Sequence, residues 1–154
     1  MASSVPAVHD YLVARIKTLP ELEQLALQVC DDWADHRGDV LVVVGGTPDN
    51  DEHYLATSYA QLSGERHEDV TVASMIWVRR TGDNASSRAR HDAYTILDAI
   101  DEFVRRDDTL GGTITPGMPA QLGEVRMRAT PNAQTAGEGR VCDLRWQLKW
   151  QHRG

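Results

Sequence analysis

The sequence has few of the residues and segments that mark specialised protein classes. Its 154 residues include two cysteines and one phenylalanine, and the longest unbroken aliphatic run is the five residues 40–44. Two cysteines exclude a disulfide-rich miniprotein, because such scaffolds hold a small fold together with several bridges. A run of five cannot cross a bilayer, which requires about 20 apolar residues.

Basic residues are also in the minority. Lys and Arg total 16 against 23 Asp and Glu, which gives a formal charge of −7 with His neutral. Proteins that coat nucleic acid usually have the opposite balance, because Lys and Arg neutralise the phosphates. Sequence-specific DNA binding is therefore not expected. The 41% hydrophobic and 25% charged residues are typical of a soluble globular protein, and the length predicts a single domain over residues 1–154.

The N-terminal residues indicate a compartment. Residues 1–6 have no basic region followed by an apolar stretch, so we expect no signal peptide and folding in the cytoplasm. In that reducing environment Cys30 and Cys142 are expected to be free, buried, small apolar residues.

Two segments have the three-and-four spacing of an amphipathic helix. The first covers residues 5–18, with Pro6 in its first turn. The second follows a turn at residues 82–84 and runs to about Arg106, with Asp83 or Asn84 predicted to cap it through a side-chain oxygen. Residues 21–33 fit both a helical stripe and an alternating strand, and periodicity alone favours the helix. The long helix is expected to bury Ala89, Ala93, Ile96, Leu97, Ile100, Phe103 and Val104.

Five further segments are predicted to be strands: residues 39–44, 53–62, 69–80, 121–130 and 141–151. Residues 69–80 are apolar on both faces, which indicates an interior strand covered on both sides. In the fourth segment, Val125 and Met127 are expected to face inward. The last segment alternates most clearly, with Cys142, Leu144, Trp146, Leu148 and Trp150 on one face.

These elements together predict an α+β fold. We expect a mostly antiparallel sheet with an N-terminal helix and one long helix packed on one face.

No residues have the spacing of a catalytic or ligand-binding motif. The six histidines include no His-Glu-x-x-His and no pair four residues apart. The densest group of possible metal ligands, within residues 31–36, is explained equally well by a solvated acidic turn. The Gly-Gly-Thr segments at 45–47 and 111–113 lack the lysine of a phosphate-binding loop, and no nucleophile, base and orienting group can be assigned. The sequence therefore predicts a protein that is not an enzyme and has no cofactor and no metal.

Three residues are candidates for contact with another chain. Four tryptophans against a single phenylalanine are unusual at this length, and core packing is their default role. Trp150 lies near a strand end and could instead anchor a subunit interface, where aromatic residues concentrate. Arg79 and Arg80 form a basic spot that is either solvated surface or a contact with a partner protein.

Three motifs occur in a characteristic order along the chain. The Val-rich strand ends in Val-Gly-Gly (44–46), a later strand closes in Trp-Val-Arg (77–79), and the long helix leads to Asp-Asp-Thr-Leu-Gly-Gly (107–112). Over roughly residues 5–150 this arrangement resembles the tail terminator (tail completion) proteins of long, non-contractile-tailed bacteriophages, the siphophages. The Asp-x-x-Leu-Gly-Gly ending of the helix is its most specific part.

The resemblance implies a structural virion protein that forms a homo-hexameric ring. Such a ring caps the tail tube, ends polymerisation of the major tail tube protein and presents a head-joining surface to the head-completion protein. It would be located in the virion, at the tail end proximal to the head, after assembly in the host cytoplasm. The resemblance also favours a strand over residues 25–30, which we adopt against the periodicity. Residues 31–37 depart from the family pattern, in which a turn rich in glycine or proline is typical.

A ring of this chain would be acidic. Six copies at −7 each give −42, and an acidic bore would let double-stranded DNA pass without specific binding. Residues 47–52 are predicted to form an acidic loop of turn-forming residues, and Asp49, Asp51 and Glu52 within it are candidate lumen acids. A ring would also cover an open sheet edge, which is an aggregation hazard in a lone subunit.

Two alternatives remain open. A head–tail connector or neck subunit would share the small size and the ring assembly. A small host enzyme or ligand-binding domain would instead require a deep pocket with converging His and Asp side chains.

Overall fold

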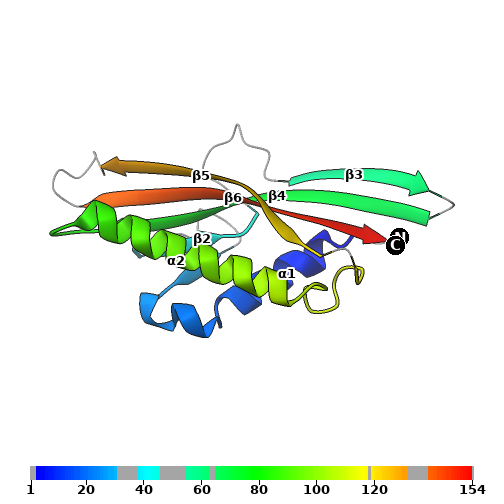
Figure 1. Ribbon diagram of the computed structural model, residues 1–154, viewed down its shortest axis with the longest axis horizontal. Helices are drawn as coiled ribbons and strands as arrows, with labels where there is room; N and C mark the ends of the chain where they lie inside the picture. Colours follow the sequence, from blue (N-terminus) through cyan, green and yellow to red (C-terminus); the bar gives the residue numbers. More distant parts are fainter. Residues whose placement is uncertain are drawn as a thin grey trace.

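The computed structural model describes residues 3–30, 38–45, 55–62, 65–117, 119–131 and 139–153. The fold has two layers: a mixed sheet and, on one side of it, the helices (Figure 1). The elements in chain order are α1 (Val5–Ile16), the 3₁₀ helix η1 (Pro20–Leu25), β1 (Gln28–Cys30), β2 (Val40–Val43), β3 (Leu55–Leu62), β4 (Glu65–Arg80), α2 (Ala85–Arg106), β5 (Gln121–Pro131) and β6 (Arg140–Arg153).

The sheet has the strand order β1-β2-β4-β6-β5, and β3 also pairs with β4. The β1–β2 pair is parallel, whereas β2–β4, β3–β4, β4–β6 and β5–β6 are antiparallel. The predicted α+β class with a mostly antiparallel sheet is confirmed. One side of β4 is shared, because β3 pairs with residues 65–72 and β2 with residues 75–78.

The paired strands β4 and β6 form the longest ribbon of the sheet. They are in register from His67↔Arg153 to Arg80↔Arg140. This ribbon is strongly twisted, so that β6 lies above β4 at one end of Figure 1 and below it at the other, as expected from the right-handed twist of strands.

The main core lies between the helices and one face of this sheet. The alternation predicted for β6 is confirmed, because its five inward residues from Cys142 to Trp150 are all buried. The predicted stripe of α2 is confirmed as well, from Ala89 to Val104. Helix α1 adds Val8, Leu12 and Ile16 to the same cluster.

A smaller apolar cluster lies on the other side of the sheet. It consists of Cys30, Leu41, Val43 and Met75, with Trp77 packed partly against it. The centre of β4 is therefore apolar on both faces, as predicted. Cys30 and Cys142 are both buried and free of a disulfide bond, which confirms their predicted state.

The ambiguous segment after α1 contains two short elements. Pro20 opens the 3₁₀ helix η1, and Ala26, with φ +50°, ends it because a left-handed residue cannot continue the turn. Among the described residues of this segment, 21–30, the strand covers residues 28–30. The prediction of a strand over 25–30 is therefore confirmed for its second half, and the helical periodicity corresponds to a single short 3₁₀ helix.

The predicted side-chain cap of α2 is wrong. Asn84 occupies the N-cap position, but its φ of +57° is left-handed and no side-chain capping hydrogen bond forms. The Arg88 guanidinium instead donates from Nη1 to the carbonyl oxygens of Thr81, at 2.9 Å, and Asp83, at 3.4 Å. This end of α2 is thus fixed by a residue inside the helix.

Candidate functional site

The Asp-x-x-Leu-Gly-Gly segment forms a compact latch between the end of α2 and α1. Asp107 accepts hydrogen bonds from the Tyr11 hydroxyl, from the backbone N–H of Gly111 at 2.9 Å and from Thr109 Oγ1 at 3.2 Å. Leu110 of the motif is fully buried. The carboxylate of Asp107, the first residue of the motif, therefore makes its hydrogen bonds within the chain, and the segment has a structural role.

The electrostatics of the latch follow from this geometry. Burial of the Asp107 carboxyl would raise its pKa, but the hydrogen bonds from Tyr11, Gly111 and Thr109 outweigh burial and hold the pKa below its usual value. Burial and the bond to Asp107 raise the pKa of the Tyr11 hydroxyl. The latch therefore consists of a charged carboxylate and a neutral phenol at physiological pH.

Gly111 is required where the latch closes. Its φ is +68°, and a Cβ at this position would overlap the ring of Tyr11. That ring in turn stacks on Phe103 with 5.9 Å between centroids. The sequence pattern identified the motif, but nothing in the sequence indicated Tyr11, which lies 96 positions before Asp107.

A fully buried carboxylate attaches the N-terminus of α1 to the sheet. Glu68 has no exposed surface and accepts hydrogen bonds from Ser3 Oγ at 2.5 Å and from both the backbone N–H and Oγ of Ser4 at 2.9 Å. Burial would raise the pKa of Glu68, but these hydrogen bonds and the nearby His152 lower it overall. Sequence reasoning placed Glu68 in a polar connection before the strand, whereas it lies within β4, because an acidic residue in a polar segment carries no signal of burial.

Trp150, one of the three predicted interface residues, belongs to this network. Its side chain is 4% exposed, and Nε1 donates to Ser4 Oγ at 2.8 Å. In the isolated chain it therefore lies in the core next to Glu68. A contact between Trp150 and a neighbouring subunit stays a prediction.

Arg79 and Arg80, the other two, lie at the end of β4 and form ion pairs within the chain. Arg79 donates from Nε and Nη2 to Asp39 Oδ1 at 2.9 and 2.7 Å. Arg80 Nε donates to Asp92 Oδ2 at 2.7 Å, which joins β4 to α2. Both side chains keep some exposed surface, 31% for Arg79 and 20% for Arg80, so the partner contact stays a prediction too.

The candidate lumen acids Asp49, Asp51 and Glu52 lie outside the described residues, as does the acidic group at residues 31–36. Within the described part of the chain, no group of three His, Cys, Asp or Glu residues could hold a metal ion. No helix of the described chain is long and apolar enough to span a membrane.

Strand β5 differs from its prediction. Val125 and Met127 pair with Trp146 and Leu144 of β6 and so share the helix-covered face. They are nevertheless 37% and 45% exposed. The alternation was correct, but the expected burial is wrong, because β5 lies at the edge of the sheet. Two large apolar side chains are thus left beside an open edge.

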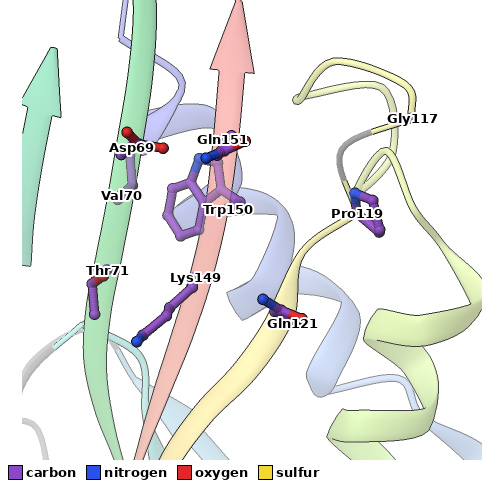
Figure 2. Close-up of a pocket in the computed structure, with 9 residues that line it drawn as sticks. All are labelled: Asp69, Val70, Thr71, Gly117, Pro119, Gln121, Lys149, Trp150 and Gln151. Carbon is purple, nitrogen blue, oxygen red and sulfur yellow. The ribbon is translucent and has the colours of Figure 1, made fainter. Parts of the chain in front are cut away.

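A hollow of about 610 Å³ lies where β5 diverges from β6. Figure 2 shows its lining residues on β4, β6 and the start of β5, and on the segment that carries Gly117 and Pro119. Its polar lining mixes one acid, Asp69, with Lys149, Thr71, Gln121 and Gln151. It contains no histidine, so the converging His and Asp side chains that an enzyme reading would require are absent from this hollow.

Comparison with known proteins gives matches to solved structures alone, where 26 chains match. No family model matches the sequence, and no curated protein matches it. Among solved structures, the chain is similar to one described as "Virion of native gene transfer agent (GTA) particle", at 12% identity and a TM-score of 0.42. The match covers 94% of this chain and 98% of the other chain.

Proposed function

We propose that this chain is a structural virion protein of a long-tailed phage or prophage, and specifically its tail terminator. Six copies form a ring on the finished tail tube, stop addition of the major tail tube protein and present a surface to the head-completion protein. The sequence resemblance, centred on the Asp-x-x-Leu-Gly-Gly segment, supports the specific assignment.

The observation that carries an assembly role is the state of the sheet edges. Within the described chain, β5 pairs only with β6, and Val125 and Met127 beside its outer edge are exposed. An open edge with apolar side chains promotes association with another chain. In a protein that assembles, such an edge can form a subunit contact. In an enzyme that acts as a free monomer, the same edge would promote aggregation.

The hydrogen bonds of the Asp-x-x-Leu-Gly-Gly segment support the same proposal. Asp107 makes its hydrogen bonds to Tyr11, Thr109 and Gly111, so the segment that resembles the family holds two helices together. A shared architectural motif is what a family of ring subunits would retain at this position.

Deletion of the gene from its phage or prophage tests the proposal. A terminator stops tube growth, so its loss should produce tails of abnormal and variable length in electron micrographs, and a plasmid copy should restore uniform tails. Tails of normal length would overturn the assignment. Normal-length tails separated from filled heads would instead identify a neck or connector subunit, because such a protein joins parts that are already complete.

Two further elements belong to the proposal. The acidic loop residues Asp49, Asp51 and Glu52 line the bore, where they repel the passing DNA. Arg79, Arg80 and Trp150 lie at or beside contacts with a neighbouring subunit or partner protein.

A further inference from the structure

The sequence of strand β3 lacks two of the devices that normally protect an edge, charged side chains and proline. Among the described strands it pairs with β4 alone. Its sequence, Leu-Ala-Thr-Ser-Tyr-Ala-Gln-Leu, contains no charged residue and no proline over eight positions. Natural edge strands are usually short, bulged or marked by Lys or Pro, because a plain edge is a template for another strand. The outer edge of β3 is therefore suited to pairing.

Strand β5 provides a second edge of similar length. A register shift between Leu122 and Val125 interrupts its first part, so the regular section is residues 125–131. This section is about as long as β3. Val125 and Met127 on it are two of the three exposed large apolar side chains of the described chain. A strand added here would cover both.

Charge favours a mixed contact over two like contacts. If β5 met its own copy in antiparallel sense, the registers that place Arg126 opposite itself or opposite Arg128 would bring like charges together, which is destabilising. A contact of β3 with its own copy would leave Val125 and Met127 in water. Pairing of β3 with β5 avoids both penalties, because β3 is uncharged.

The two edges are also separated in space. In Figure 1, β3 and β5 lie toward opposite ends of the long axis of the chain. One molecule can therefore hold a different neighbour at each edge.

The geometry points to a head-to-tail seam in which β5 of one copy pairs with β3 of the next. A second copy of this chain is thus the occupant of both edges. Such heterologous contacts close into a ring when the rotation between copies permits. The inference rests on the proposed function, since it names the surfaces through which the ring subunits associate.

Cysteine pairs test the seam in tails purified from the phage or prophage that encodes the chain. Ser58→Cys in β3 and Met127→Cys in β5 are introduced separately and together, and a cysteine at each of the other positions in 55–62 then replaces Ser58→Cys in turn to sample the register. A disulfide requires Cα atoms within about 7 Å. After mild oxidation, at least one double variant should give a ladder of linked multimers on a denaturing gel, and each single variant should stay monomeric.

Three results would overturn the seam. Dimers from Ser58→Cys alone would show pairing of β3 with itself, and dimers from Met127→Cys alone would show pairing of β5 with itself. No crosslink in any double variant, with the protein still bound to the tails, would exclude the seam while leaving the proposed function intact. The crosslink and the gene deletion can also disagree. If the double variant gives a ladder but deletion of the gene leaves tail length unchanged, the seam is supported and the tail-terminator assignment is wrong.

Lysine substitution provides a second measurement. Thr57→Lys with Ser58→Lys places a charge on each face of β3, because neighbouring residues in a strand point to opposite faces. This variant should fold and lose multimers. Ser87→Lys with Thr95→Lys, at two exposed positions of α2, is the matched control and should retain them. Equal multimer content in both variants would contradict the seam.

Discussion

At the residue scale, Glu68 is the buried charge on which the position of α1 depends. Glu68→Ala removes the acceptor for Ser3 and Ser4 and leaves buried donors unpaired, which costs roughly 1–3 kcal/mol. We expect a lower urea midpoint, followed by tryptophan fluorescence. Glu23→Ala, at an exposed position of η1, is the control and should leave the midpoint unchanged. A similar loss in both variants would show that the network contributes nothing specific.

The same carboxylate predicts a pH dependence. The folded pKa of Glu68 lies below its ordinary value, so the unfolded chain binds a proton more readily in this range. Its contribution to stability is present above about pH 4.3, the unperturbed value, and is lost as the pH falls through the folded pKa. Urea titrations from pH 7 to pH 3 should show a steeper loss for the wild type than for Glu68→Gln. Parallel curves would contradict this assignment.

Gly111 and Gly112 form a natural matched pair. Both have positive φ, +68° and +84°, but only at Gly111 would a Cβ overlap Tyr11, while nothing lies within 4 Å of a Cβ at Gly112. Gly112→Ala should therefore cost only the left-handed conformation, roughly 1–2 kcal/mol, and Gly111→Ala distinctly more. Thermal unfolding monitored by circular dichroism measures the difference. Equal losses would mean that Tyr11 moves aside without cost.

Two substitutions of Trp150 distinguish a role in the core from a role in a subunit interface. Its 4% exposure and its bond to Ser4 predict that Trp150→Ala lowers the free energy of unfolding by about 3–5 kcal/mol. Trp150→Phe keeps most of the bulk and is the variant for assembly measurements. If Trp150 also contacts a neighbour, native mass spectrometry of the Phe variant should show folded monomers. Intact hexamers would remove Trp150 from the interface.

At the element scale, the sequence predicted best where a strong periodic pattern coincides with full burial. Strand β6 and helix α2 have long stripes whose apolar positions all enter one core, so no other arrangement would bury them. Residues 20–30 were ambiguous because a 3₁₀ helix and a three-residue strand are both shorter than the pattern needed to distinguish them. Alternation in β5 gave the correct faces but could not indicate its position at the sheet edge.

The contacts of the candidate site were less predictable, for a related reason. Asp107 has its distant partner, Tyr11, in α1, 96 positions away, and the partners of Glu68 lie just before α1, about 64 positions away. Local patterns contain no information about such pairs. The glycines of the motif could be identified from the sequence, whereas the tyrosine ring that requires one of them could not.

Edge position predicts how β5 responds to substitution. Val125→Thr with Met127→Thr changes exposed side chains and should alter the stability of the isolated chain by no more than about 0.5 kcal/mol. Leu144→Ala, at the fully buried position opposite Met127, should cost about 2–5 kcal/mol. Thermal melts measure both. A large loss in the double threonine variant would show that β5 is already covered in the isolated chain.

At the scale of the whole molecule, two carboxylates, the buried Glu68 and the partly buried Asp107, join α1 to the rest of the fold. Glu68 connects its first turn to β4, and Asp107 connects Tyr11 near its middle to the end of α2. The helical layer is therefore fixed to the sheet at separate points. A subunit fixed in this way can present its open edges in a constant geometry, which a closed ring requires.

Net charge gives the last prediction, which concerns the bore. Reversing Asp49, Asp51 and Glu52 to Lys changes each subunit from −7 to −1 and would place basic groups where DNA passes. Attraction between Lys and phosphate should slow DNA ejection from purified phage, and added salt should relieve it by screening. The control reverses Glu21, Glu23 and Asp98, which are exposed on η1 and α2 and give the same net charge. Slower ejection in both variants would reflect net charge alone, and unchanged ejection in the loop variant would exclude the loop from the bore.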